Sequence, residues 1–115
     1  MPNPTSALRR VNQLLLDAER EYTPQAYARA LAAVEELPDQ DDPEVRFRLA
    51  AVKHAMAEFR GDVAMLREAT AEYERLYEAG GLFPGLAKLM PELIEDCNRQ
   101  LRDAESRKFG WGERH

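Results

Sequence analysis

Apolar residues recur along most of the chain at intervals of three and four positions, the spacing of one face of an α-helix. The first stripe consists of Leu8, Val11, Leu15, Ala18 and Tyr22. Comparable stripes cover residues 26–37, 45–59, 63–77 and 93–104. No stretch alternates apolar and polar residues between turn signals, as a half-buried strand would. The pattern therefore predicts an all-α protein of about five antiparallel helices.

Capping residues and prolines mark where the second and third helices begin. Thr23-Pro24 and Asp42-Pro43 each place a capping side chain before a proline. Proline suits the first helical turn because its missing amide needs no partner there. After the third stripe, Gly61 fits a left-handed helix end and is followed at once by the next cap. So short a turn makes the third and fourth helices antiparallel neighbours.

The last third of the chain is less regular. Residues 80–81 are both glycine and end the fourth helix, and an apolar loop follows. Residues 86–90 are expected to form one helical turn before Pro91, because proline removes a helical hydrogen bond and clashes with the preceding turn. The fifth helix is therefore predicted to begin at Pro91 and to end near Arg107.

Displacing the sequence by 39 positions superimposes features of the first two helices on the next two. The pairs are Leu8 with Phe47, Val11 with Ala50, Ala18 with Ala57, Thr23 with Asp62, Tyr27 with Leu66, Ala30 with Ala69, Val34 with Tyr73 and Leu37 with Leu76. A second displacement carries Phe47 to Leu86 and Ala50 to Leu89. This pattern is typical of a helix-turn-helix unit used about two and a half times.

Small residues at the expected helix crossings (Ala57 and Ala69), the Gly61-Asp62 turn and proline-marked unit starts accompany this periodicity. In these features residues 6–106 resemble a degenerate tetratricopeptide-like helical-hairpin repeat protein. The family's early bulky aromatic and its Leu-Gly pair are not clear here, and its usual unit is about 34 residues. The resemblance implies stacked hairpins that bind a partner on their inner face. The alternative architecture is a compact five-helix bundle.

Composition fits a single helical domain over residues 1–106, followed by a C-terminal tail over residues 107–115. The 115 residues are 44% hydrophobic and 32% charged, with a formal net charge of −5. This charge argues against general affinity for nucleic acid or anionic membranes, which basic side chains hold. No apolar run is long enough to span a membrane. The absence of an export signal and the single cysteine favour the cytoplasm, and the Arg and Ala bias suits a GC-rich bacterial or phage genome.

Candidate chemistry is sparse. His54 and Glu58 are four residues apart and form at most half of a metal site, because no further ligands are evident. Cys97 lies at helical spacing with Leu93 and Leu101 and is expected to be a buried, inert thiol. The chain contains no phosphate-binding loop, nucleophile elbow or metalloprotease motif. The sequence therefore predicts no enzyme, no catalytic residue, no metal and no cofactor.

The charged and aromatic segments favour an interaction protein instead. The acidic run at residues 35–44 is expected to solubilise a turn and to favour the start of the third helix. For the tail three alternatives are open: Phe109 and Trp111 fold back onto the helices, they anchor a partner, or the segment is a loose end. The expected contact surface is a face of the first and third helices that carries three basic residues and a histidine. These residues are Arg46, Arg48, Lys53 and His54. The tail is a second candidate.

The favoured function is thus a non-catalytic module or adaptor that binds another protein of unknown identity, with a homo-oligomer in the same interaction class. Two rivals remain open. A nucleic-acid-binding regulator would need its arginines on one face. These are Arg9, Arg10, Arg46, Arg48, Arg99 and Arg102. An acidic phage or accessory inhibitor would instead use residues 35–44 to block a basic partner.

Overall fold

The computed structural model describes residues 4–106, and every regular element in this range is an α-helix. The helices are α1 (Pro4–Glu21), α2 (Pro24–Glu35), α3 (Pro43–Arg60), α4 (Val63–Ala79) and α5 (Pro84–Ser106). The expected all-α class with five helices is therefore confirmed. Two of the predicted binding residues, Phe109 and Trp111, lie outside the described residues.

Local capping accounts for the starts of α2, α3 and α4. The side chains of Thr23, Asp42 and Asp62 each accept a hydrogen bond from an amide of the first turn, at 2.8 to 3.2 Å. Each bond satisfies one of the amides that a helix start leaves unpaired. Gly61 ends α3 with a left-handed φ of 68°, a conformation that costs glycine little. The acidic run thus supplies the α3 cap, Asp42, as predicted.

The expectation that Pro91 would begin the fifth helix is wrong, because α5 begins at Pro84 and continues through Pro91. Leu86 and Met90 are buried before the proline, and Cys97 is buried after it. Pro91 itself is exposed. One continuous apolar stripe therefore packs against α4 on both sides of the proline, and this packing compensates for the lost helical hydrogen bond.

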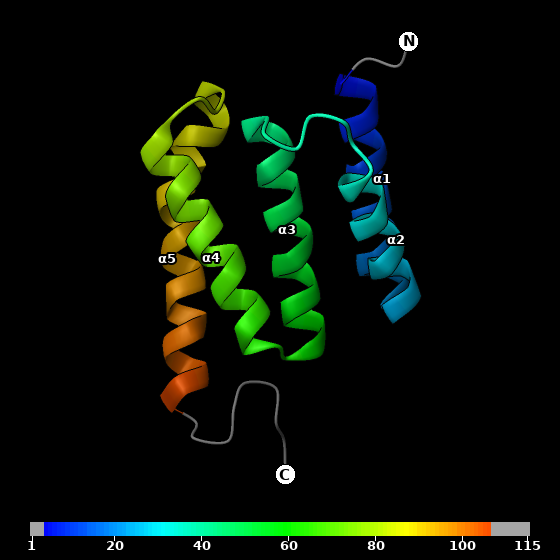
Figure 1. Cartoon of the computed structure of the whole chain (residues 1–115). Coiled ribbons are helices and arrows are strands. Elements are labelled where there is room, and N and C mark those ends of the chain that lie inside the picture. Colours follow the sequence, from blue (N-terminus) through cyan, green and yellow to red (C-terminus); the bar gives the residue numbers. More distant parts are fainter. Residues whose placement is uncertain (1–3, 107–115) are drawn as a thin grey trace.

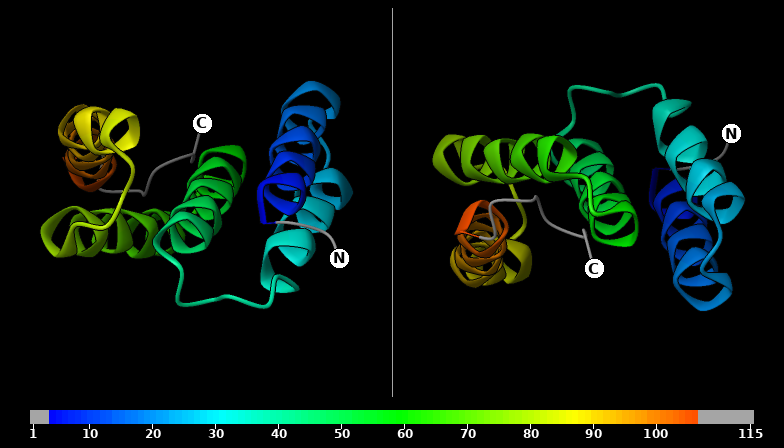
Figure 2. Two further views of the ribbon diagram at one scale, coloured as in Figure 1. Left: turned by 90° about the horizontal axis from the view of Figure 1, so that it is seen from above. Right: turned by 90° about the horizontal axis from the view of Figure 1, so that it is seen from below.

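Each helix packs against the next in sequence, and α3 also contacts α1. The helices alternate in direction along the molecule (Figure 1). Viewed end-on, α1 and α5 lie on one side of the molecule, and α2 and α4 lie on the other. Helix α3 lies between the α1–α2 pair and the α4–α5 pair (Figure 2). The result is a slab with extents of 51 × 32 × 19 Å in which α3 is the central helix.

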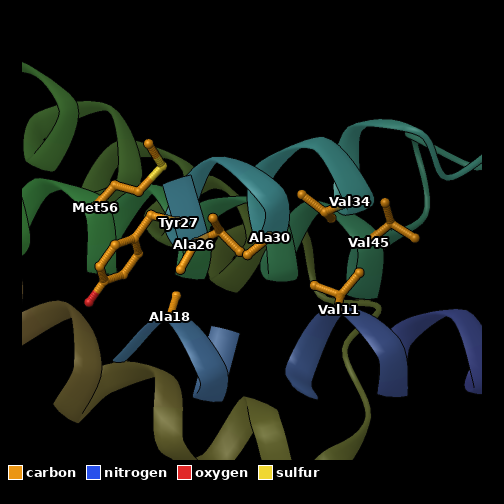
Figure 3. Close-up of a cluster of buried hydrophobic side chains, with 9 residues drawn as sticks. Val11, Ala18, Ala26, Tyr27, Ala30, Val34, Val45 and Met56 are labelled. Carbon is orange, nitrogen blue, oxygen red and sulfur yellow. The ribbon is translucent and has the colours of Figure 1, made fainter. Parts of the chain in front are cut away.

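Two hydrophobic clusters meet at α3. The first joins α1 and α2 to α3 and is drawn in Figure 3; its buried members are Val11, Ala18, Ala26, Tyr27, Ala30, Val34, Val45, Val52 and Met56. The second joins α3 to α4 and α5; its buried members are Phe47, Ala50, Ala57, Leu66, Tyr73, Leu76, Leu86, Met90 and Cys97. Met65 packs against both clusters. The two sides of α3 therefore belong to different parts of the core.

Most of the positions paired at a spacing of 39 residues match in burial; Leu8 and Leu37 are half-buried although Phe47 and Leu76 are buried. The pairs in which both residues are buried include Val11 with Ala50, Ala18 with Ala57, Tyr27 with Leu66, Ala30 with Ala69 and Val34 with Tyr73. Thr23 and Asp62 match as caps. The correspondence weakens in α5, where Leu89 is exposed although its counterpart Ala50 is buried.

None of the helices within residues 4–106 combines the length and the apolar character needed to cross a membrane.

Candidate functional site

The four residues of α3 that were expected to form one binding surface point in three directions. Successive helical residues are about 100° apart, so residues 46 and 53 share a face while residues 48 and 54 do not. Arg46 and Lys53 pair with acids of α4, and His54 contacts α4 and α5. Arg48 lies on the remaining side of the helix. The three sides of α3 therefore face different neighbouring residues.

Arg46 and Lys53 border an outer groove, a hollow of about 380 Å³ between α3, α4 and the connection that precedes α3. Arg46 Nε lies 2.7 Å from Glu72 Oε2, and Arg75 Nη2 lies 2.8 Å from Glu72 Oε1. Lys53 Nζ lies 3.4 Å from Glu68 Oε1. Burial raises the pKa of the Glu72 carboxyl, but hydrogen bonds and charge from Arg46 and Arg75 outweigh it and lower the pKa overall. The cations of the outer groove therefore already have partners.

His54 belongs to a polar network that ties α3 to α4 and α5. Its Nδ1 lies 3.3 Å from the Tyr73 hydroxyl, and its Nε2 lies 3.2 Å from Gln100 Oε1. Gln100 Nε2 in turn donates to Glu58 Oε2 at 2.7 Å. The Cys97 sulfur lies 3.7 Å from His54 Nε2. With only 15% of its side chain exposed, His54 has a structural role in this network and little surface left for a partner.

The proximity of Cys97 to His54 does not make a nucleophilic pair. Cys97 is fully buried, and burial raises the pKa of its thiol to about 11, although a hydrogen bond with Thr70 opposes the shift. A thiol with this pKa is protonated at neutral pH and is a poor nucleophile. The nearest His54–Glu58 approach is 4.0 Å, and in the described part of the chain no group of three or more His, Cys, Asp or Glu is placed to hold a metal ion.

Arg48 differs from the other three predicted residues because its charge has no acidic partner. Its Nε is buried without a hydrogen-bond acceptor, and no ion pair joins its guanidinium to an acid within residues 4–106. Its guanidinium carbon lies 5.3 Å from the centroid of the Phe47 ring. A buried donor without an acceptor costs about 1–3 kcal/mol. Among the four predicted residues of α3, Arg48 is therefore the one whose N–H donors find no acceptor within residues 4–106.

The face of α3 that bears Arg48 also carries Ala51, Ala55 and Glu58, which recur at helical spacing and are here called the inner face. Contacts on its two sides show its position: Glu58 accepts a hydrogen bond from Gln100 of α5, and the neighbouring Phe59 makes an edge-to-face contact with Tyr22, which follows α1. The inner face thus lies on the α1 and α5 side of the slab (Figure 2). Its two half-buried alanines leave the backbone of α3 open to close approach by another chain.

The arginines required by the nucleic-acid hypothesis do not share one face. Arg46 lies in the outer groove, Arg48 lies on the inner face, and Arg99 on α5 pairs with Asp96. Phosphate binding depends on several unpaired cations acting together along one surface. This arrangement does not favour a nucleic-acid interface.

Several exposed residues of interest were not predicted as site residues. Tyr77, Phe83 and Leu89 are exposed and all lie at the end of the molecule where α4 ends and α5 begins. Tyr22 was assigned to the apolar stripe of the first helix, but it follows the last residue of α1 with a left-handed φ of 57° and is 62% exposed. The Thr23-Pro24 start signal right after it could have suggested that Tyr22 lies outside the helix.

Comparison with protein-family models, with curated proteins and with solved structures gives no match.

Proposed function

We propose that this protein is a non-catalytic interaction module of helical hairpins that works in the cytoplasm and binds another protein through the inner face of α3. The state of Arg48 carries the proposal. Its buried Nε lacks an acceptor, and its charge lacks an acidic partner within residues 4–106. The Nη groups of the same guanidinium are not buried and also bond to no residue of 4–106, so a carboxylate or carbonyl group of a bound protein could pair with them, and arginine is a frequent anchor in protein interfaces.

The surroundings of Arg48 support a macromolecular partner. Ala51 and Ala55 follow it along the inner face and are only half-buried, so a bound segment could approach the α3 backbone closely. The matching burial of positions 39 apart in the two hairpins supports the hairpin-repeat interpretation, in which the inner helices present the binding surface. The tail with Phe109 and Trp111 remains a second candidate for contact.

The experiment that tests this function uses the full-length protein immobilised as bait for an extract of the source cells. We expect one protein to be retained in near-stoichiometric amount and identified by mass spectrometry. Arg48→Met should retain at least tenfold less, because the methionine keeps the aliphatic stem and removes the charge. Sedimentation of the purified chain tells a second copy from a different protein.

Arg102→Met is the matched control, since Arg102 is exposed on α5 and away from the inner face. It should retain the same protein as the unaltered chain. Circular dichroism should show that both variants are folded. No retained protein above background, or equal retention by Arg48→Met, would contradict the proposed function.

A further inference from the structure

A second feature of the same side of the slab is a small cavity of about 240 Å³ where α1 ends, α2 begins and α3 ends. Its lining residues are Glu19, Tyr22, Tyr27, Ala55, Glu58 and Phe59. Two of them, Ala55 and Glu58, also belong to the inner face. The cavity is thus continuous with the surface on which Arg48 lies.

Three aromatic rings form the apolar part of this cavity. The Tyr22 and Phe59 ring centroids are 4.5 Å apart with planes at 85°, and those of Tyr27 and Phe59 are 4.8 Å apart. The left-handed backbone of Tyr22, whose amide donates to the Ala18 carbonyl at 2.7 Å, places its exposed ring beside Phe59. Such a conformation is uncommon for a bulky residue. The electron-rich faces of such rings attract cations.

Two carboxylates form the polar part. Glu19 makes no hydrogen bond or ion pair with any other residue of the described chain. Glu58 accepts from Gln100 through Oε2, and its Oε1 lies 4.0 Å from His54 Nε2. No lysine or arginine lines the cavity. Both acids, after burial itself, raise the pKa of the Tyr27 hydroxyl, which shows that their negative field reaches into the cavity.

The Tyr27 hydroxyl is the third polar group. Only 4% of the residue is exposed, yet its hydroxyl has no hydrogen-bond partner among residues 4–106. The ring points its oxygen away from Val11, Val34 and Val45 at the other end of the first core cluster (Figure 3). The oxygen itself is not buried, so it opens into the cavity, where it can donate and accept hydrogen bonds. A ligand in the cavity could therefore form a hydrogen bond with it.

These three observations select one ligand chemistry. An anion would be repelled by Glu19 and Glu58, and a wholly apolar group would displace water from the carboxylates and the Tyr27 hydroxyl without replacing its hydrogen bonds. A positive group with N–H donors and an aliphatic stem fits all of them, since its donors reach the carboxylates and the hydroxyl while its stem contacts the rings. We propose that this cavity binds the lysine or arginine side chain of a partner segment that lies along the inner face of α3.

This inference rests on the proposed function and adds the direction in which the partner segment lies along the inner face. Arg48 and Glu58 are ten residues apart on α3, or about 15 Å at the helical rise per residue. The partner segment should therefore present an acidic group to Arg48 and a basic group to the cavity at about that separation. In an extended segment this corresponds to roughly four or five residues.

The test measures binding of the isolated side-chain chemistry to the full-length protein by NMR titration. The probes are N-acetyl-lysine amide and N-acetyl-arginine amide, with the neutral N-acetyl-norleucine amide and N-acetyl-citrulline amide as isosteres. We expect saturable shifts at the amides of Tyr22, Tyr27 and Phe59, with a Kd of about 1–10 mM for the stronger cationic probe. The neutral probes should give no saturable shift, and comparison of the two cations identifies the preferred side chain.

Variants test the assigned groups. Glu19→Gln and Tyr27→Phe should each weaken cation binding at least threefold, because one removes a charge and the other removes only the hydroxyl. Glu35→Gln is the matched control, since Glu35 is exposed at the opposite end of α2, and it should leave the Kd unchanged. Equal binding of neutral and cationic probes, no saturable shift at all, or unchanged affinity in both site variants would overturn the proposal.

Two further comparisons separate this site from the proposed function and from the chain's own tail. Arg48→Met should leave the Kd of the probes unchanged. If Arg48→Met loses partner capture and the probes bind neither protein, the cation site is overturned and the proposed function stands. Full-length protein with Arg107, Lys108 and Arg114 all changed to Gln should bind the probes with the same Kd. A several-fold rise in affinity would identify the tail as the occupant and overturn assignment to a partner.

Discussion

Glu72 is the residue on which the charges of the outer groove converge. Its carboxylate accepts from Arg46 of the neighbouring helix and from Arg75 of its own helix. Only 21% of the Glu72 side chain is exposed, so solvent screens these contacts less than it screens the other ion pairs of the surface. This arrangement links α3 to α4 in addition to the apolar contacts between them.

Because the folded state lowers the pKa of Glu72, the stabilisation is present above the unfolded value, near 4.5, and is lost as the pH falls through the folded value. We expect Glu72→Gln to lower the free energy of unfolding by about 1 kcal/mol at pH 7. The difference from the unaltered protein should shrink on acidification below about pH 4.5. Urea unfolding followed by circular dichroism at several pH values measures both quantities.

Glu68→Gln provides the comparison, because Glu68 is 65% exposed and its Lys53 contact is longer, at 3.4 Å. Its removal should change the free energy of unfolding by less than about 0.5 kcal/mol. A Glu72 effect that is equally large at pH 3 and pH 7 would show that the carboxylate charge is not the cause.

At the scale of helices, α5 shows how packing decides where a helix begins and ends. Leu86 and Met90 precede Pro91 and are buried in the same cluster as Cys97, which follows it. A helix that began at Pro91 would detach the earlier two residues from this stripe. Pro91 is exposed and lies outside this stripe, so the packing of the residues on both sides of it keeps the chain helical despite the missing amide.

Pro91→Ala should therefore stabilise the protein, because alanine restores the amide that can donate to the preceding turn. We expect the free energy of unfolding to rise by about 1–3 kcal/mol, with a higher melting temperature in calorimetry. Pro84→Ala is the control and should have a much smaller effect, since Pro84 is the first residue of α5 and lacks no intrahelical bond there. A destabilised Pro91→Ala protein would show that α5 depends on the proline.

For the whole molecule, the decisive feature is that α3 contributes to both core clusters. Val52 belongs to the cluster with α1 and α2, and Phe47 belongs to the cluster with α4 and α5. Loss of either cluster removes the packing on one side of α3. The two hairpins should therefore unfold together in one transition, as small domains usually do.

Substitution in each cluster tests this coupling. Leu66→Ala should lower the free energy of unfolding by about 2–5 kcal/mol, and Val34→Ala should lower it by a smaller amount, since both residues are fully buried. Each variant should keep a single transition in denaturant with an unchanged slope. Leu16→Ala, at a position that is 60% exposed, should shift stability by less than about 0.5 kcal/mol. Two separated transitions in either core variant would contradict the coupling.

The sequence by itself determined the features that depend on neighbours in the chain. Helix type follows from apolar spacing of three and four, and the starts of α2, α3 and α4 follow from Thr23, Asp42 and Asp62. These side chains reach only their own first turn, so their effect is local and can be predicted without a fold. The burial of Cys97 could also be predicted from residues close to it in the chain, because the other residues of its helical stripe are apolar.

Only the tertiary structure decided which neighbour each helix face meets. Periodicity marks an apolar face but does not say what covers it, so it could not separate the outer groove of Arg46 from the inner face of Arg48. It also could not bring together Glu19 and Glu58, which come from different hairpins, around the hydroxyl of Tyr27. That cavity exists because α1 and α3 pack side by side, and a contact between residues so far apart in sequence is fixed by packing alone.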